Sequence, residues 1–189
     1  MGIRIERLRP NSTRTRELIE AAPEGLHENE EEPRSTNPVA ANTAVAAIGI
    51  AAAIICLGGL AAAAKTPLVL GSFGSSCVLL FAYPRSLFCR PRNFIGGHMV
   101  SSAVGLVCLE AGGPHYWVMG AAVALAFVAM QFTGTIHPPA GGNPVILFLL
   151  NADWSFLWFP TLAGTLVVHA VALAHLWMVK WSQRRKPPA

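Results

Sequence analysis

The sequence reads IHPPAGGNPVILFLL at residues 136–150 and LVLGSFGSSCVLLFAY at residues 68–83. Each stretch begins with residues that resist a helix and ends in a short apolar run. A helix that crosses the hydrocarbon core of a bilayer needs about 20 apolar residues. The apolar runs Gly74–Tyr83 and Gly141–Leu150 give only about 15 Å each at 1.5 Å per residue. We therefore predict two half-helices, each preceded by about six residues of extended chain at about 3.3 Å per residue.

Four longer apolar segments surround these stretches, and we expect each to span a membrane. The composition agrees, because hydrophobic residues make up 53% of the chain and charged residues 13%, against about 25% charged in soluble domains. Helices this apolar on all sides suit lipid as their solvent. The predicted spans are Ala40–Ala64, Phe94–Leu109, Trp117–Phe132 and Trp158–Trp181.

The two halves of the apolar region resemble each other at an offset of 67 residues. FGSSCVLLF (73–81) aligns with AGGNPVILF (140–148), and IGGHMVSSAVGL (95–106) aligns with LAGTLVVHAVAL (162–173). The offset continues through two loops without a gap and keeps glycines in register. This pattern predicts an internal repeat with three crossings in each half.

Charge decides between two topologies. The positive-inside rule puts the basic C-terminus in the cytoplasm, and six crossings then put the Arg85–Arg92 loop there too. Four full spans with two re-entrant segments would put that loop outside. We therefore predict an all-α polytopic membrane protein with an inverted 3+3 repeat and two broken half-helices, and we keep four spans plus two re-entrant segments as the alternative.

The segments outside the apolar region differ sharply from it. Residues 1–39 carry six Arg and eight Glu, and such a composition cannot bury a core. We expect a disordered cytoplasmic tail at 1–39, a transmembrane domain at 40–181 and a basic cytoplasmic tail at 182–189. The net charge of +4 does not indicate nucleic acid, because the basic residues flank apolar segments.

The inverted arrangement would point both half-helix N-termini toward the middle of the bilayer. Free N–H groups and the helix dipole bind anions there without a Lys or Arg, and no intramembrane carboxylate is present to hold a cation. We expect no catalytic constellation, no metal and no cofactor, so the protein is not predicted to be an enzyme. The residues expected to line the pore are Gly71, Ser72, Gly74, Ser75, Ser76, His98, His137, Pro138, Pro139, Gly141, Gly142 and Asn143.

Three stretches resemble the HPP family of integral membrane proteins in order: PLVLGSFGSSCVLLFAYP (67–84), PRNFIGGHMVSS (91–102) and TIHPPAGGNPVIL (135–147). The family is named for its His-Pro-Pro, here His137-Pro138-Pro139. Some plant and cyanobacterial members are implicated in nitrite transport, so the resemblance implies that solute. Gly142-Asn143-Pro144 replaces the Ala-Thr-Ala of the usual pattern, and Asn143 stands where the half-helix is expected to begin.

We expect a membrane transporter or channel for a small anion such as nitrite. The alternative is a non-transporting sensor or assembly module that uses the N-terminal tail as its contact surface, while an intramembrane enzyme built on His98, His137 or His169 is disfavoured. The expected partners are membrane lipid, the solute and further copies in a homo-oligomer, with no nucleic acid. We expect the bacterial inner (plasma) membrane, with both termini in the cytoplasm.

Overall fold

The computed structural model describes residues 39–65 and 70–184, and this part of the chain is built from helices. Four segments are long and apolar enough to cross a membrane: Thr43–Ala63, Pro91–Gly112, Tyr116–Thr133 and Leu157–Ser182. They correspond to helices α2 (Val39–Ala64), α4 (Pro91–Gly112), α5 (Tyr116–Thr133) and α7 (Ala163–Arg184). An all-α polytopic membrane protein is thereby confirmed. The predicted tails lie outside the described residues, except for Val39 and residues 182–184.

Two shorter helices fall where the half-helices were predicted, but they begin earlier than expected. Helix α3 (Gly71–Ala82) includes Gly71 and Gly74, which were expected to lie in or next to extended chain. The Pro-rich stretch forms a 3-10 helix, η3 (Pro138–Gly142), which continues directly into α6 (Asn143–Leu150). Proline is compatible with the first turn of a helix because the N–H it lacks has no partner there. Among the described residues of these two stretches, Leu70 and residues 135–137 are the ones outside a helix that precede the half-helices.

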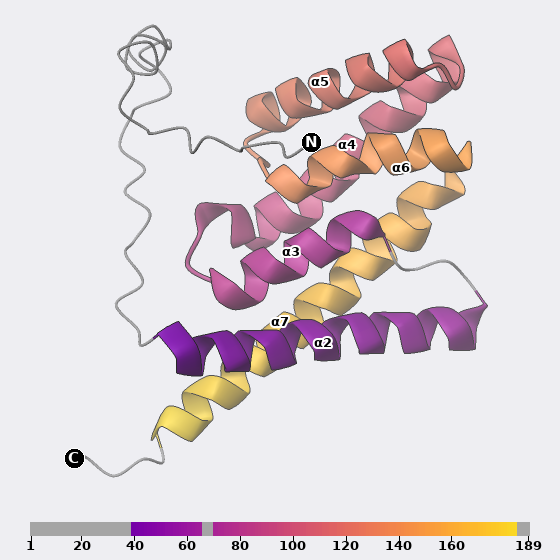
Figure 1. The fold of residues 1–189 in the computed structure, drawn as a ribbon. Helices are drawn as coiled ribbons and strands as arrows, with labels where there is room; N and C mark the ends of the chain where they lie inside the picture. Colours follow the sequence, from indigo (N-terminus) through magenta and orange to yellow (C-terminus); the bar gives the residue numbers. More distant parts are fainter. Residues whose placement is uncertain (1–38, 66–69, 185–189) are drawn as a thin grey trace, which may run out of the picture. The chain divides into compact units, whose positions relative to one another are not determined.

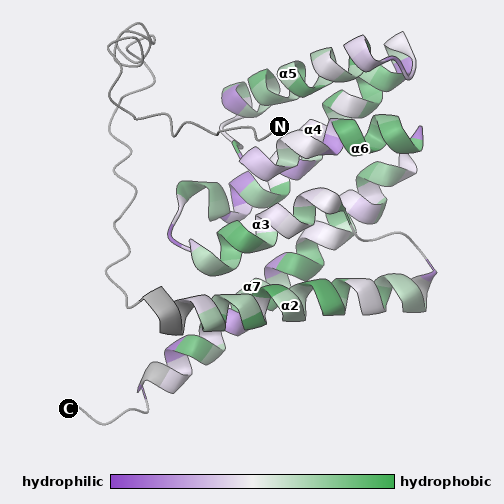
Figure 2. Ribbon diagram, in the orientation of Figure 1, coloured by the Kyte–Doolittle hydropathy of each residue, from purple (hydrophilic) through white to green (hydrophobic). Residues whose placement is uncertain are grey.

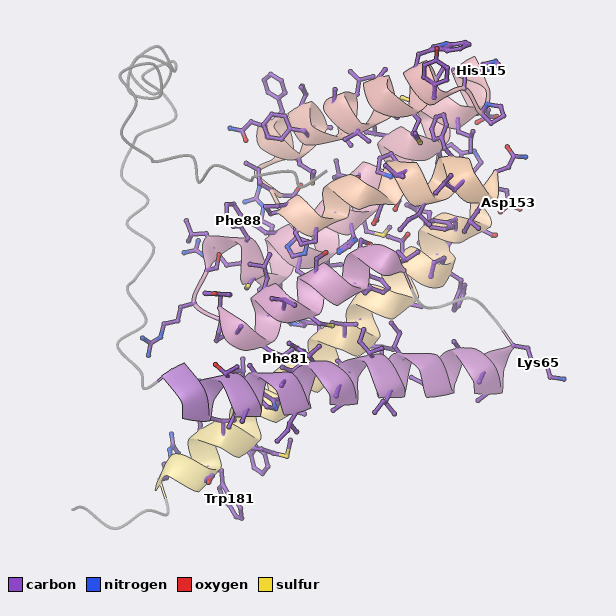
Figure 3. All side chains as sticks on the ribbon, in the orientation of Figure 1. Lys65, Phe81, Phe88, His115, Asp153 and Trp181 are labelled. Atoms are coloured by element: carbon purple, nitrogen blue, oxygen red, sulfur yellow. The ribbon has the colours of Figure 1, made fainter. Side chains whose placement is uncertain are left out.

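The six apolar segments alternate in direction, as Figure 1 shows when the colours are followed. Lys65, His115 and Asp153 lie at one end of the helices, and Phe88 and Trp181 lie toward the other (Figure 3). We call these the Asp153 end and the Phe88 end. Both short segments connect one end to the other, as six crossings require, and neither returns to the end where it began. The symmetry of the two halves stays a prediction.

The distribution of side chains is the reverse of that in a soluble protein. Ile55 is 73% exposed and Phe132 is 88% exposed, whereas His98, His137 and Asn143 are 0% exposed. Figure 2 shows hydrophobic residues along most of α2 and hydrophilic residues mainly at helix ends and in loops. An isolated chain that exposes such large apolar surfaces is stable only when lipid or another protein covers them.

Helix α7 begins later than the sequence predicted. A continuous helix was expected from Trp158, but segment η4 (Leu157–Leu162) is kinked at Phe159, which has φ −134° and ψ 114°. The bond between Phe159 and Pro160 is cis. A residue that precedes proline is driven out of the helical region by the proline ring, so the regular helix begins only at Ala163.

Helix α4 lies at the centre of the bundle and contacts α5, α6, α7, η3 and η4. It approaches α6 and η3 closely because glycines face them. A Cβ on Gly105 would lie 2.7 Å from Leu147 Cδ1, and a Cβ on Gly97 would lie 2.6 Å from the Thr135 carbonyl oxygen. Small residues permit this close packing in membranes, and it fixes the second half-helix against α4.

Candidate functional site

The two half-helices meet near their N-terminal ends. Ser72, in the first turn of α3, donates a hydrogen bond from its hydroxyl to Asn143 Oδ1 at 2.7 Å. A Cβ placed on Gly142 would lie 3.9 Å from Ser72 Cβ. The two half-helices therefore touch at positions that are 71 residues apart in sequence.

Two histidines lie beside this contact and are joined to it through Ser76. Ser76 Oγ lies 3.0 Å from His98 Nε2 of α4 and 2.8 Å from His137 Nε2 at the start of η3. His137 Nδ1 lies 2.8 Å from the carbonyl oxygen of Phe88, in the 3-10 turn η2 (Leu87–Cys89). His98, His137 and Ser76 are fully enclosed. The network therefore joins four segments of the chain across the middle of the bundle.

Asn143 links this network to further hydroxyl groups on α4 and η4. Its Nδ2 donates to Ser102 Oγ at 2.9 Å, and Ser102 Oγ lies 3.0 Å from Thr161 Oγ1. Sequence reasoning missed Ser102 and Thr161. Ser102 follows His98 by four residues, which puts both on one face of α4, so this spacing was the available signal.

Aromatic rings enclose the two histidines. The Phe94 ring centroid lies 5.3 Å from that of His98 and 5.2 Å from that of His137, and Phe73 lies 5.2 Å from His98. Phe73 and Phe94 are themselves fully buried. Apolar walls strengthen the hydrogen bonds between enclosed polar groups and make any unpaired group there costly.

The structure brings together five of the residues predicted from the sequence, namely Ser72, Ser76, His98, His137 and Asn143. Of the remaining seven, Ser75 donates from its hydroxyl to the Ser72 carbonyl oxygen at 3.0 Å, and the glycines and prolines have no side-chain hydrogen-bonding group. Gly71, Gly74 and Ser75 are exposed on the other side of α3, Pro138 is exposed, and Pro139, Gly141 and Gly142 are half-buried. The five enclosed side chains fill the space between the half-helices, so an ion could enter only if their contacts separated.

The expectation of bare backbone amides fails at the second half-helix. Pro138 and Pro139 have no N–H, and the Ala140 N–H donates to the His137 carbonyl at 2.9 Å. The donors that face the meeting point are therefore side chains. At the first half-helix, the N-cap residue Leu70 makes no side-chain hydrogen bond to the first turn of α3.

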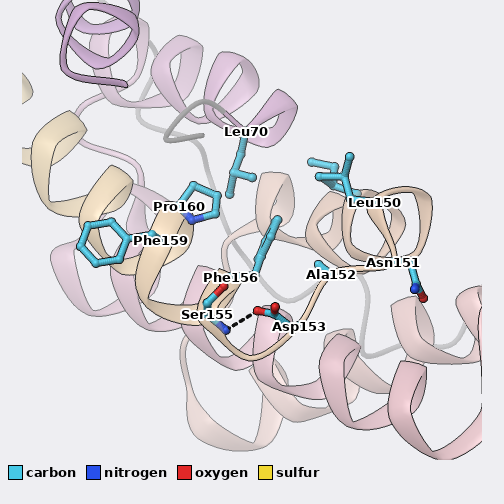
Figure 4. A pocket seen from close by; sticks show the side chains of 10 residues that line it. Leu70, Leu150, Asn151, Ala152, Asp153, Ser155, Phe156, Phe159 and Pro160 are labelled. Carbon is cyan, nitrogen blue, oxygen red and sulfur yellow. Dashed lines mark hydrogen bonds between the residues drawn. The ribbon is translucent and has the colours of Figure 1, made fainter. Parts of the chain in front are cut away.

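A cavity of about 300 Å³ lies at the Asp153 end (Figure 4). Leu70 and Pro160 form part of its wall, and these residues lie within two positions of Ser72 and Thr161 in the network. Asp153 lies on the lining, and its Oδ1 accepts a hydrogen bond from the Ser155 N–H at 2.8 Å. The Ser155 hydroxyl and N–H hold the pKa of this carboxyl below its ordinary value.

A second cavity of about 330 Å³ is lined by residues of the connection that contains Phe88, including Arg85 and Arg90, and by His169 of α7. His169 Nδ1 is buried and has no hydrogen-bond partner within the described residues. The His169 ring lies 6.3 Å from Phe94, the ring that covers His98 and His137. The two cavities thus approach the polar network from opposite ends.

No group of three His, Cys, Asp or Glu side chains within residues 39–65 and 70–184 could hold a metal ion. The polar groups of this site are hydroxyl, amide and imidazole groups.

Comparison with known proteins agrees with this architecture. The HPP transmembrane region matches residues 35–187. Two relatives from Dictyostelium discoideum are described as transmembrane proteins. One is 36% identical over 118 residues, which cover 58% of this chain and 41% of the relative, and the other is 34% identical over 133 residues, which cover 66% and 42%.

The chain spans about two fifths of the length of these curated relatives. No solved structure was found to match it. The match to the transmembrane region covers most of the chain, and the chain therefore belongs to the HPP family of membrane proteins.

Proposed function

We propose that the protein transports a small monovalent anion across a membrane, with nitrite as the first solute to test. The observation that carries the proposal is the enclosed polar network of Ser72, Ser76, His98, His137 and Asn143 between two cavities at opposite ends. Groups of this kind inside a membrane are costly to bury and are usually retained for function. Nitrite itself comes from the family resemblance.

The composition of the network favours an anion over a cation. Its members are hydroxyl, amide and imidazole groups, which can donate hydrogen bonds, and it contains no carboxylate. The acidic side chains within the described residues are Glu110 and Asp153, and Glu110 accepts a hydrogen bond from Trp154, next to Asp153. Both lie toward the Asp153 end, away from the histidines.

The closed state of the network favours a transporter over an open channel. Ser72 and Asn143 belong to different half-helices, so separating those helices would open the path from one cavity to the other. At the offset of 67 residues Ser76 aligns with Asn143, and both contribute to the network. This equivalence supports the inverted repeat that underlies alternating access in many transporters.

The orientation follows from charge. Arg85 and Arg90 lie in the connection that contains Phe88, and Arg92 lies in the first turn of α4. These residues and the C-terminal end of α7 all lie toward the Phe88 end. Cytoplasmic loops carry an excess of Lys and Arg. We therefore assign that end, and with it both termini, to the cytoplasmic side of a plasma membrane or bacterial inner membrane.

Solute flux into proteoliposomes tests the proposal. We expect faster uptake of nitrite than in protein-free vesicles, and a panel of nitrite, nitrate and formate defines the range of anions. His137→Ala and Asn143→Leu should abolish uptake because each removes a member of the network. His175→Ala is the control, since His175 packs on Phe81 away from the site, with ring centroids 5.1 Å apart. Equal uptake by all three variants would contradict the assigned site.

Two other roles make different predictions. A sensor or assembly module would bind the anion or a partner without any flux. A hydrolase is suggested by the 2.8 Å distance from Ser76 Oγ to His137 Nε2, a nucleophile–base spacing. We propose no such role, because Ser76 Oγ is enclosed and also contacts His98. Covalent labelling of Ser76 by a fluorophosphonate would favour the hydrolase instead.

A further inference from the structure

We propose that the network takes up one proton with each anion, and that Ser76 switches between two hydrogen-bond arrangements to accommodate it. The inference rests on the proposed transport function and adds the proton as the second substrate of the same site. It follows from the direction in which each hydrogen bond in the network must run.

The donors and acceptors of the network can be assigned by starting from the Phe88 carbonyl. A carbonyl oxygen can only accept, so His137 Nδ1 must carry the hydrogen in their 2.8 Å contact. In a neutral imidazole the other nitrogen then has no hydrogen, and His137 Nε2 accepts from the Ser76 hydroxyl at 2.8 Å. The single hydrogen of Ser76 is now used. Its oxygen must therefore accept from His98 Nε2–H at 3.0 Å.

The other end of the chain agrees with this assignment. His98 Nδ1 is left as an acceptor, and Asn143 Nδ2 donates to it at 3.1 Å. The orientation of the Asn143 amide is fixed by two further contacts. Its Nδ2 faces the His98 carbonyl oxygen at 3.3 Å, and its Oδ1 accepts from Ser72 at 2.7 Å. With both imidazoles neutral, every donor from Ser72 to His137 points the same way along the chain.

A second arrangement is already built into the site. Ser76 Oγ lies 2.9 Å from the carbonyl oxygen of Ser72, which also accepts from the hydroxyl of the exposed Ser75 at 3.0 Å. If His137 binds a proton at Nε2, the Ser76 hydroxyl can rotate to donate to that carbonyl. Its oxygen then accepts from both imidazoles, so the extra proton leaves no polar group unpaired and requires no movement of heavy atoms. An apolar side chain at position 76 could not make this exchange, and an amide could not make it without turning the whole group, because only a hydroxyl donates and accepts through one atom and redirects its hydrogen by rotation.

The surroundings of His137 explain why an anion would accompany the proton. The titratable or charged groups that face it are His98 from α4, at 5.1 Å between ring centroids, and His169 from α7 behind the Phe94 ring. Arg92 donates to the Thr133 carbonyl at 2.7 Å near the same end and adds positive charge. Within the described residues no carboxylate contacts this group.

An imidazolium buried without a counter-charge is strongly unfavourable. A monovalent anion beside it cancels the charge, so the proton and the anion each favour the binding of the other. One proton enters from the more acidic side, one anion enters with it, and the loaded site carries no net charge. Transport should therefore be electroneutral.

The test measures nitrite and proton movement together in proteoliposomes that contain a trapped pH dye. We expect the full-length protein to concentrate nitrite when the outside is more acidic, to move one proton per nitrite, and to be insensitive to a potassium diffusion potential set with valinomycin. Protein-free vesicles subtract the passive permeation of nitrous acid. Nitrite flux that follows the membrane potential without proton movement would overturn the proton coupling and leave the proposed transport intact. No nitrite flux at all would overturn both.

Variants at position 76 distinguish a loss of the hydrogen-bond switch from a general loss of packing. Ser76→Ala removes the hydroxyl, and proton-coupled flux should fall about tenfold or more, the order expected when a buried polar group loses its partner. Ser76→Thr keeps the hydroxyl and should keep one proton per nitrite. Ser182→Ala, on an exposed turn of α7, is the control. A Ser76→Ala protein that still moves one proton per nitrite at the wild-type rate would exclude the switch, whatever its stability.

Discussion

Replacing Asn143 by leucine tests whether the polar network holds the two half-helices together. Leucine branches at Cγ as asparagine does, so the change keeps the shape of the side chain and removes its hydrogen bonds. Four contacts are lost: the bond from Ser72 at 2.7 Å, the bond to His98 Nδ1 at 3.1 Å, the bond to the His98 carbonyl oxygen at 3.3 Å and the bond to Ser102 at 2.9 Å.

The magnitude follows from what the lost partners can do instead. The Ser102 hydroxyl can turn toward Thr161, but His98 Nδ1 has no other partner than Asn143 among the described contacts. One buried polar group left unpaired costs about 1–3 kcal/mol, although hydrogen bonds inside membranes average about 0.6 kcal/mol. We therefore expect a loss of about 2 kcal/mol.

Thermal unfolding of the purified protein in detergent measures this effect. At about 2–4 °C per kcal/mol for a chain of this size, Asn143→Leu should lower Tm by about 4–8 °C. Gln131→Leu is the matched control, because Gln131 is exposed on α5 and makes no side-chain hydrogen bond among those described. A Tm for Asn143→Leu equal to that of the wild type would refute the network as the link between the half-helices.

Further substitutions probe the packing and the cavity at the Asp153 end. Gly97→Ala should destabilise the protein by about 1–3 kcal/mol and abolish flux, because the new Cβ would lie 2.6 Å from the Thr135 carbonyl oxygen and 2.8 Å from His137 Cβ. Gly120→Ala is the control, because a Cβ there meets nothing within 4 Å. It should leave both stability and flux unchanged in the same assays. Asp153→Asn should lower KM for the anion without changing the maximal rate, since a negative charge on the lining of this cavity repels it, and the effect should shrink at 0.15 M salt, where the Debye length is about 8 Å. Because the pKa of Asp153 lies below its ordinary value, the carboxylate stays ionised from about pH 5.5 to 7.5, and the difference between variant and wild type should not change over that range; a difference that vanishes toward pH 5.5 would contradict this.

The long spans were predictable because hydropathy alone specifies them. The expected span Phe94–Leu109 lies inside α4 (Pro91–Gly112), and the error is confined to the ends. Pro91 and Arg92 read as loop residues by hydropathy, yet proline suits the first turn of a helix and arginine reaches the polar end, where it donates to the Thr133 carbonyl. The break at Phe159 was missed because one proline in a long apolar run leaves average hydropathy almost unchanged.

The residues of the half-helix site could be predicted from the sequence, but the local backbone geometry could not. Ser72, Ser76, His98, His137 and Asn143 could be identified from the sequence, because few other polar residues occur in these apolar segments. The 3-10 geometry of Pro138–Gly142 was not readable from Gly and Pro, which favour both turns and helix starts. Bare amides were therefore expected where the structure supplies side-chain donors.

A reversible cross-link between the half-helices tests the central claim most directly. Cβ atoms at Ser72 and Gly142 would be 3.9 Å apart, within the range of about 3.5–4.5 Å that a disulfide requires. The pair Ser72→Cys and Gly142→Cys is introduced after replacement of the four native cysteines, with each single variant as a control for the oxidant. We predict that nitrite flux stops when the disulfide forms and returns when it is reduced. Undiminished flux through protein shown by mass spectrometry to be fully cross-linked would mean that the half-helices need not separate, and that the anion does not pass between them.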